Sequence, residues 1–431
     1  MRIALTSYRS KPHCGGQGVY LRQLSRALVD LGHSVEVFSG PPYPELDSRV
    51  AFTAVPSLDL YAEENPFRLP RPSEFKTLID LQEFAIMCTA GFPEPRTFSK
   101  RVLPMLAARA HEFDVVHDNQ SLGYGLLALR DVGLPLVGTI HHPITVDRRL
   151  DLHAAGWRRQ LAIRRWYGFL RMQAKVARAI ALHVTPSQNS AEDAIRDFGL
   201  RSDQMSVVPI GVDTDVFRPH GERVPGRIVA MSSADVALKG LATLLRAAAV
   251  LSRSQNVELV VVSKPVPGGP TEKLVAELGL ATRVRFVNGL DETTLAALVA
   301  SAEVAVVPSL YEGFSLPAVE AMASGTPVIA SDVASLPEVV GRDGSCGVLV
   351  PPGDVGGFAE AIAALLADPK RRGAMSIAAR ERAVERFSWS ATALATAAVY
   401  RRAIAEQNGS VHGESVHGES AHPETGRPSP C

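Results

Sequence analysis

Two glutamates on either side of a glycine-containing turn form the segment best suited to chemistry. Glu312 and Glu320 bracket Gly-Phe-Ser-Leu-Pro-Ala-Val, and an apolar run typical of a buried strand comes just before them. Ser315 is suited to cap a helix that begins there, so the backbone N–H groups of residues 314–316 would point outward and attract a diphosphate. Carboxylates repel phosphate but accept hydrogen bonds from hydroxyls, here from a ribose on one side and a sugar on the other. The segment therefore predicts a nucleotide-sugar site, whose donor-binding residues are Gly313, Phe314, Ser315, Leu316 and Glu320.

This pattern, Glu, seven residues and Glu with Gly-Phe between, resembles the signature of retaining glycosyltransferase family 4, the glycosyl transferases group 1. The resemblance implies the GT-B fold, with Glu320 holding the ribose and Glu312 contacting the donor sugar as a catalytic residue. It implies transfer of a sugar from a UDP- or GDP-linked donor to an acceptor hydroxyl, such as one on a glycolipid or a cell-envelope glycan. The acceptor would attack the sugar from the same face from which the leaving group departs, so the anomeric configuration is retained. The resemblance implies that this reaction needs no metal or other cofactor.

A second loop, residues 232–240, resembles the family's loop that ends in Lys-Gly before a helix. The resemblance implies that Lys239 neutralises the departing diphosphate as a catalytic and donor-binding residue. Family members usually carry an arginine five or six residues earlier, where this sequence has serines and an alanine. Either another cation such as Lys264 compensates, or N–H groups and hydroxyls such as that of Ser233 hold the diphosphate.

The first half contributes two candidate segments. Gly15 and Gly16 follow the first predicted strand and resemble the family's Gly-Gly loop, which lets the backbone approach the donor phosphate. Asp118 and Asn119 come after another predicted strand, and we expect them at the cleft edge as acceptor-binding residues.

Thr-Ile-His-His-Pro, residues 139–143, ends a predicted buried strand, and ligands gather at such strand ends in parallel sheets. His141 matches the histidine of the family's Thr-x-His pattern, whose imidazole faces the transferred sugar. Strand alternation decides which of His141 and His142 points inward, and we expect His141 to be the catalytic one.

Short apolar runs alternate with helical patterns along the whole chain. They predict an α/β protein with two Rossmann-like, doubly wound parallel sheets of about six strands each, which face an interdomain cleft. The predicted strands are residues 2–6, 34–38, 115–117, 136–140, 183–185 and 206–209 in the first sheet, and 227–231, 257–262, 284–287, 304–307, 327–330 and 347–350 in the second. The Pro-rich region 40–110 is interpreted as an excursion from the first domain.

We expect an acceptor-binding domain at 1–210, a linker at 211–226 and a nucleotide-sugar-binding domain at 227–386. The resemblance implies that a helix at 387–407 crosses back onto the first domain. Residues 408–431, which contain two copies of Val-His-Gly-Glu-Ser, read as a disordered tail whose histidines are solvated. Asp213 and Asp215 mimic an Asp-x-Asp metal motif, but a linker without further acidic ligands argues against a metal there.

Residues 157–178 hold seven Lys and Arg with interleaved aromatic side chains and no acidic residue, as the sequence shows. Such a segment is either a helix in peripheral contact with an anionic membrane, near a lipid acceptor, or a packed amphipathic helix with a solvated basic face.

Composition sets the remaining bounds. Lys plus Arg and Asp plus Glu are both 45, and this absence of a basic excess argues against a nucleic-acid partner. The four cysteines are far apart, and the start lacks the pattern of a signal peptide, so we expect a cytoplasmic protein, in peripheral contact with the inner membrane face if the basic segment binds lipid. Two alternatives stay open: a glycoside phosphorylase on the same scaffold, and a non-catalytic nucleotide-sugar-binding protein.

Overall fold

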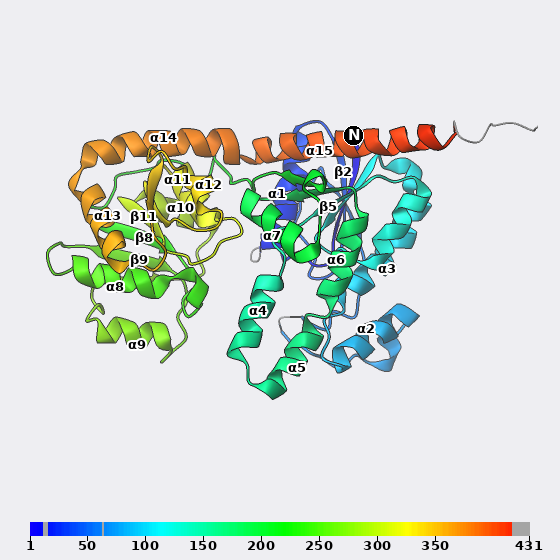
Figure 1. Ribbon diagram of the computed structural model, residues 1–431, viewed down its shortest axis with the longest axis horizontal. Helices are drawn as coiled ribbons and strands as arrows, with labels where there is room; N and C mark the ends of the chain where they lie inside the picture. Colours follow the sequence, from blue (N-terminus) through cyan, green and yellow to red (C-terminus); the bar gives the residue numbers. More distant parts are fainter. Residues whose placement is uncertain (12–15, 63, 416–431) are drawn as a thin grey trace, which may run out of the picture.

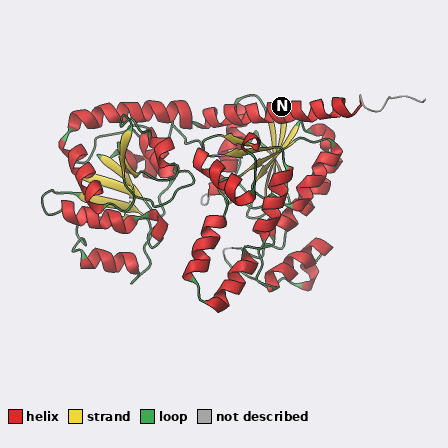
Figure 2. Cartoon of the chain, viewed as in Figure 1, coloured by secondary structure: helices red, strands yellow, loops and turns green. Residues whose placement is uncertain are grey.

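The computed structural model describes residues 1–11, 16–62 and 64–415, and it consists of two α/β domains side by side (Figures 1 and 2). Each domain contains one sheet in which all neighbouring strands are parallel, ordered β3-β2-β1-β4-β5-β6-β7 in the first and β10-β9-β8-β11-β12-β13 in the second. The prediction of two doubly wound parallel sheets is confirmed, and every predicted strand overlaps an observed one.

The strands of the first sheet are β1 (Arg2–Ser7), β2 (Ser34–Ser39), β3 (Ala51–Ala54), β4 (Val115–Asn119), β5 (Leu136–Thr139), β6 (Leu182–Thr185) and β7 (Met205–Val207). Those of the second are β8 (Arg227–Met231), β9 (Glu258–Val262), β10 (Val284–Val287), β11 (Val304–Val307), β12 (Val328–Ser331) and β13 (Gly347–Val350).

Helices cover both faces of each sheet (Figure 1). The first domain has α1 (Gly16–Asp30), α2 (Leu78–Cys88), α3 (Glu94–Ala108), α4 (Thr145–Ala154), α5 (Trp157–Trp166), α6 (Phe169–Ala179) and α7 (Gln188–Phe198). The second has α8 (Leu241–Leu251), α9 (Pro270–Glu277), α10 (Glu292–Ala300), α11 (Leu316–Ala323), α12 (Leu336–Val340), α13 (Val355–Ala367) and α14 (Pro369–Phe387), and α15 (Trp389–Ser415) follows. Short 3₁₀ turns lie at Pro72–Glu74, Ala110–Glu112, Tyr124–Val132, Ser202–Gln204 and Ala237–Lys239.

The strands are apolar on both faces because each face has its own core. In β1, Ile3 and Leu5 pack in the core next to α1 and α15, whereas Ala4 between them belongs to the core next to α3 and α6. The second sheet repeats this arrangement, with Ile228 of β8 in one core and Val229 in the other. Because the strand interiors are mostly apolar, the polar groups that can form a site gather at the strand ends.

The first sheet has seven strands where we expected about six, because β3 adds an unpredicted strand at its edge, inside the region interpreted as an excursion. Three of its four residues are exposed, so the strand lacks the apolar run that marks a buried strand in the sequence.

Two chain segments cross between the domains side by side. Val212 pairs with Ser388 as an isolated parallel bridge, and the Val212 N–H donates to the carbonyl of Phe387 at 2.7 Å. Helix α15 then packs on α1 and on strands β4, β5 and β6 of the first domain, where the Tyr400 hydroxyl lies 2.6 Å from Nδ1 of His117.

Helix α15 runs to Ser415, beyond residue 407 where we expected it to end. Extending an existing helix fixes only one residue for each hydrogen bond gained, so a helix held by tertiary packing can extend past its packed part. Residues 416–431 of the predicted tail lie outside the described residues.

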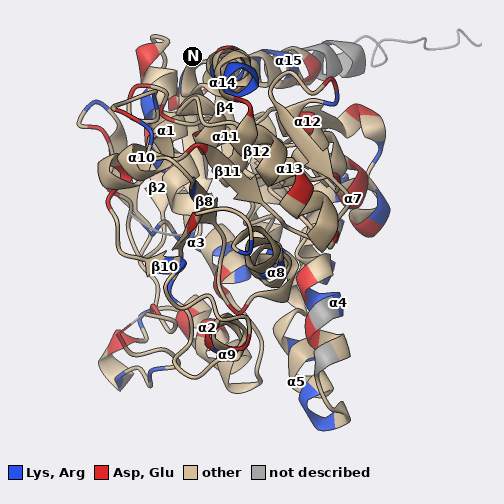
Figure 3. Ribbon diagram, turned by 90° about the vertical axis from the view of Figure 1, so that its left-hand side faces the viewer, with Lys and Arg blue, Asp and Glu red and all other residues tan. Residues whose placement is uncertain are grey.

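The basic segment 157–178 does not form one helix. It breaks into α5 and α6 at Gly168, a residue of low helix propensity. Helix α6 packs its apolar face in the first domain and leaves its basic side chains exposed. Helix α5 also exposes Trp157 and Leu161, and Figure 3 shows basic residues at its far end. Within the described ranges, no helix has both the length and the apolar character required to cross a bilayer.

Candidate active site

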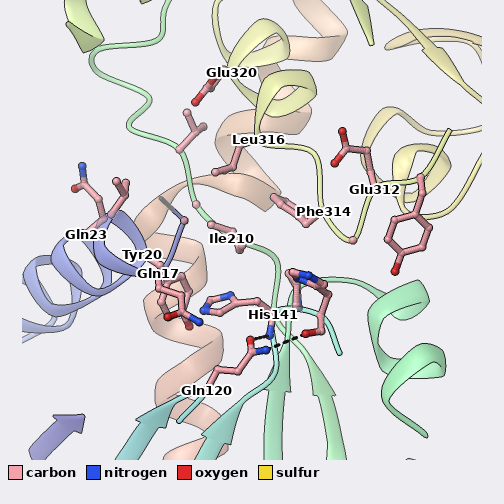
Figure 4. A pocket seen from close by; sticks show the side chains of 18 of the residues that line it. Gln17, Tyr20, Gln23, Gln120, His141, Ile210, Glu312, Phe314, Leu316 and Glu320 are labelled. Carbon is pink, nitrogen blue, oxygen red and sulfur yellow. Dashed lines mark hydrogen bonds between the residues drawn. The ribbon is translucent and has the colours of Figure 1, made fainter. Parts of the chain in front are cut away.

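A cavity of about 470 Å³ lies between the two domains, at the carboxyl ends of the central strands of both sheets. Figure 4 shows Glu312, Phe314 and Glu320 on the wall formed by the second domain and His141, Tyr20 and Gln120 among the first-domain residues opposite.

Glu312 is the best-held side chain of the second-domain wall. Its carboxylate Oε1 accepts hydrogen bonds from Lys239 Nζ at 2.9 Å and from Ser309 Oγ at 2.8 Å. Its backbone carbonyl accepts from Oγ and N–H of Ser335, which precedes α12, at 2.9 and 3.3 Å. The structure therefore brings Lys239 and Glu312 together, and their shared role in a donor site stays a prediction.

Lys239 reaches Glu312 because two loops are tied together. The Leu310 N–H donates to the carbonyl of Leu238 at 2.7 Å, and Gly240 follows Lys239 with φ of +65°. A Cβ at Gly240 would lie 1.8 Å from the Pro308 carbonyl oxygen, so only glycine allows this close approach. Among the described residues that line the cavity, Lys239 is the only Lys or Arg.

The first turn of α11 also lines the cavity on the second-domain side. Ser315 caps the helix by accepting from the Ala318 N–H at 3.4 Å, and Pro317 sits in the first turn, where its missing N–H costs nothing. In the described part of the chain, the N–H groups of residues 314–316 donate no hydrogen bond. N–H groups that are free at a helix N-terminus are able to bind an anion.

Glu320 lies one helical turn further along α11 and also lines the cavity. Burial, and to a smaller extent repulsion by Glu292, raises the pKa of Glu320 to about 7. Within the described residues this carboxyl makes no hydrogen bond, so it is available to a ligand's hydroxyl groups.

His141 is the central side chain of the first-domain wall. Its Nε2 lies 2.8 Å from Oδ1 of Asn119, its backbone N–H donates to Oε1 of Gln120 at 2.7 Å, and the Tyr20 ring packs edge-on 4.7 Å away. Asn119 Nδ2 donates to the carbonyl of Gln17 at 3.2 Å, which turns Oδ1 toward the imidazole. Nε2 therefore carries the proton, and Nδ1 is left as an acceptor.

The imidazole of His141 is neutral. Burial, helped by the neighbouring His142 and His117, lowers the pKa of His141 to about 3. A neutral ring in this position exchanges hydrogen bonds with hydroxyls and brings no fixed charge near the donor.

His142 also reaches the cavity, although the alternation argument favoured His141 alone. Its Nε2 lies 3.2 Å from Oδ2 of Asp147 on α4, and both side chains are partly exposed. Opposite them, a Cβ at Gly313 would lie 3.3 Å from His142 Cβ, so the donor loop and this histidine are in close contact. The bond from His142 lowers the pKa of Asp147, and Lys239 adds to that effect.

Several predicted site residues are placed elsewhere. Asp118 is fully buried behind the wall, where its carboxylate accepts from Thr6, Ser121 and the Leu122 N–H, and burial raises its pKa to about 6. Asn119 does not line the cavity but orients His141. Among the donor candidates, Ser233 is exposed outside the cavity and Ser315 is buried in its cap.

The remaining donor candidates divide in the same way. Gly16, Gly313, Phe314 and Leu316 line the cavity, whereas Gly15 lies outside the described residues. Lys264, the proposed substitute for the missing arginine, is exposed and does not line the cavity.

Sequence reasoning missed the contribution of α1. Gln17, Tyr20 and Gln23 all line the cavity and follow one another at helical spacing, which places them on one face. That spacing was a readable signal. Trp389, which contacts Tyr20 edge-on at 5.9 Å, arrives from the far end of the sequence and gave no such signal.

Comparisons with known proteins agree with this geometry. Residues 14–216 match the family model Glycosyltransferase Family 4, and residues 212–382 match Glycosyl transferases group 1. An MMP alpha-(1->4)-mannosyltransferase of Mycolicibacterium hassiacum is 58% identical over 94% of this chain and 99% of its own length. D-inositol 3-phosphate glycosyltransferase 2 of Catenulispora acidiphila is 32% identical over 94% of this chain and 96% of its own.

Solved structures share the architecture. A sucrose-phosphate synthase of Thermosynechococcus elongatus has a TM-score of 0.70 at 27% identity and covers 94% of this chain and 99% of its own. Anabaena HepE in complex with UDP has a TM-score of 0.66 over 93% of this chain and all of its own, and at 18% identity it shows the fold alone. With family models matching both halves and a 58% identical mannosyltransferase aligned over nearly the whole length, the chain belongs to the GT-B glycosyltransferases of family 4, the glycosyl transferases group 1.

Proposed function

We propose that this glycosyltransferase is a retaining enzyme that moves mannose from a nucleoside-diphosphate donor, GDP- or UDP-linked, to an acceptor hydroxyl and forms an α-(1→4) linkage. The sugar and the linkage are taken from the name of the 58% identical relative. The donor class rests on one observation: the Lys239–Glu312 pair faces a helix N-terminus with unused N–H groups inside an interdomain cavity.

The second-domain wall binds the donor in this proposal. The diphosphate lies against the N–H groups of residues 314–316 and Lys239, and the ribose hydroxyls donate to Glu320. Glu312 has one carboxylate oxygen engaged by Lys239 and Ser309, which leaves Oε2 to accept from a hydroxyl of the donor sugar.

Bond cleavage moves negative charge onto the diphosphate, and the transition state at the sugar is oxocarbenium-like. Lys239 and the helix N-terminus stabilise that charge best because both are fixed before the reaction begins. The acceptor hydroxyl attacks from the face that the diphosphate leaves, and a phosphate oxygen takes its proton. This geometry retains the α configuration and agrees with the neutral state of His141, which orients hydroxyls through Nδ1 without acting as a base.

The first-domain wall positions the acceptor in this proposal. His142 and Asp147 form a partly exposed polar pair in it, and His142 lies directly across from Gly313. A hydroxyl that donates to Asp147 would lie next to the donor sugar. The peripheral membrane contact predicted for 157–178 also stays a proposal. It now rests mainly on α5, because α6 packs its apolar face in the first domain and leaves only its basic side chains exposed. Flotation with anionic and neutral liposomes tests it.

The decisive assay is a panel of UDP- and GDP-linked sugars with α-mannoside acceptors, with released nucleotide and product measured together. We expect turnover with a mannosyl donor and an α-(1→4) product by NMR. A product with inverted anomeric configuration would contradict the retaining mechanism, and turnover restricted to mannose 1-phosphate would point to a phosphorylase, which the comparisons do not favour.

A further inference from the structure

The first turn of α7 in the first domain makes a dense set of hydrogen bonds to the second domain. Oγ of Ser187 and Oγ of Ser190 both donate to the carbonyl oxygen of Gly313, at 2.6 and 3.0 Å. The Tyr311 hydroxyl donates to Oδ2 of the buried Asp193 at 2.6 Å. All of these contacts join the donor loop after β11 to the opposite domain.

A carboxylate from the second domain also caps this helix. Glu338, on α12, accepts from the N–H of Gln188 at 2.7 Å and from the N–H of Asn189 at 2.9 Å. These are the first two residues of α7, and no intrahelical partner exists for their N–H groups. A negative charge at a helix N-terminus is favourable both through these bonds and through the helix dipole.

The same elements hold the backbone of the donor loop. Ser335, just before α12, donates twice to the carbonyl of Glu312, and the next carbonyl, that of Gly313, is held by α7. Two consecutive carbonyls are therefore fixed, one by each domain. The Glu312 side chain extends from this fixed backbone, and its carboxylate accepts the hydrogen bond from Lys239.

Among the residues that the structure describes, the opposite side of the cavity has no comparable contact. There Arg22 of α1 approaches Glu292 of α10 at 3.9 Å, and both side chains are partly exposed. An ion pair of that length and exposure contributes little. Within the described residues, the α7 side carries the stronger polar contact between the domains.

We propose that these contacts form a latch that couples approach of the two domains to the position of the Glu312 carboxylate. The α7 latch comprises Ser187, Ser190, Asp193, Tyr311, Gly313 and Glu338. When the domains separate, α7 keeps its own cap, Ser187, but loses the carboxylate of Glu338. The Gly313 carbonyl then loses both hydroxyl donors, and the loop that carries Glu312 is held from one side only. Glu338 and Asp193 are thus positioning residues, which act through Glu312 and through the relative placement of the domains. The coupling to catalysis rests on the proposed donor contact of Glu312.

Glu338→Gln tests the latch, because an amide retains the shape but cannot accept from both N–H groups with a charged oxygen pair. Tyr311→Phe breaks a separate latch bond. Glu360→Gln, at an exposed position of α13, is the matched control. The two latch variants are expected to lower kcat about tenfold while the dissociation constant for GDP or UDP changes less than about twofold, since the nucleotide is held by the second domain alone.

Two readouts do not depend on turnover. With the nucleoside diphosphate bound, small-angle X-ray scattering is expected to give a larger radius of gyration for Glu338→Gln than for the wild-type protein. Hydrogen exchange at the amides of Gln188 and Asn189 is expected to be faster in that variant. The control should match the wild type in both measurements.

The outcomes separate the latch from the proposed function. If the wild type turns over no nucleotide sugar, the proposed function fails, and scattering and exchange still decide whether the latch holds the domains. Unchanged scattering and exchange in both latch variants would overturn the latch itself. A larger radius with an unchanged kcat would overturn its role in positioning Glu312.

Discussion

The two walls of the cleft differ in how they carry charge. The second-domain wall presents the Lys239–Glu312 pair, Glu320 and the first turn of α11. The first-domain wall presents a neutral His141, and its titratable pair, His142 and Asp147, is partly exposed. Charge that moves during glycosyl transfer accumulates on the diphosphate, so fixed charges belong on the wall that holds it. The opposite wall has to orient hydroxyls, which neutral hydrogen-bonding groups do without disturbing that field.

The largest effect on activity is expected from removing the cation of the second-domain wall, Lys239. Lys239→Met should lower kcat about 100- to 1000-fold, because no other Lys or Arg among the described cavity-lining residues can replace it. Released nucleoside diphosphate gives the rate. Lys273→Met, at an exposed site of α9, should retain wild-type activity. A Lys239→Met enzyme within threefold of wild type would place the diphosphate elsewhere.

His141, the neutral residue of the first-domain wall, should respond differently. His141→Gln is expected to lower kcat about 10- to 100-fold, since it removes the Nδ1 acceptor, with little change in nucleotide affinity. Because the pKa of His141 is about 3, its titration should be absent from the rate profile of the wild type above pH 5. The exposed His111→Gln serves as the control. Loss of nucleotide binding in His141→Gln would show that this wall also holds the diphosphate.

Glu320 should make donor binding depend on pH. Its pKa of about 7 means that the carboxyl is largely protonated at pH 6, and only the ionised form accepts from two hydroxyls. Donor affinity measured by calorimetry should therefore rise about tenfold at most from pH 6 to pH 8. Glu320→Gln should bind weakly at both values, whereas the exposed Glu277→Gln should behave as wild type.

The same shift predicts the sign of a stability effect. The folded-state pKa of Glu320 lies above the ordinary value of 4.5, so its contribution to the ligand-free protein is fully present below pH 4.5. That contribution is lost as the pH rises through 7. Glu320→Gln should consequently raise the Tm of the ligand-free protein at pH 8 but not at pH 4, and a lower Tm at pH 8 would contradict the burial argument.

The smallest change in activity is expected at Asp118. Asp118→Asn places an amide where three donors point, so it should lower stability by about 1–3 kcal/mol through lost and unsatisfied hydrogen bonds. The acceptor KM should stay within about twofold of wild type, because Asp118 does not reach the cavity. Asn119→Ala, which frees the His141 ring, should affect kcat more than Asp118→Asn does, and the reverse order would return Asp118 to the acceptor site.

The parts of the site that are local in sequence could be predicted. Glu312 and Lys239 lie between a strand end and a helix start, and Glu320 lies one turn into the helix; such positions converge in any parallel sheet. Asp118 and Asn119 show what the sequence could not predict, namely which side chains of a strand end face the cavity. Neighbouring residues of a strand point to opposite sides, but the sequence does not state which side is the cavity.

Contacts between residues far apart in the sequence could not be predicted from the sequence alone. Trp389 and Tyr20 meet only because α15 returns to the first domain, and Glu338 caps a helix from the opposite domain. The edge strand β3 is paired on one side and largely exposed, so its composition carries no signal of burial. In each case the partner determines the role, and the partner lies far away in the sequence.

A crystal structure with GDP or UDP bound tests the central claim most directly. We predict the diphosphate at the first turn of α11, within hydrogen-bonding distance of Lys239 Nζ and the N–H groups of residues 314–316, with the ribose at Glu320. A nucleotide lodged instead against His141 and Tyr20, with its phosphates on the first-domain wall, would contradict the division of charge between the two walls.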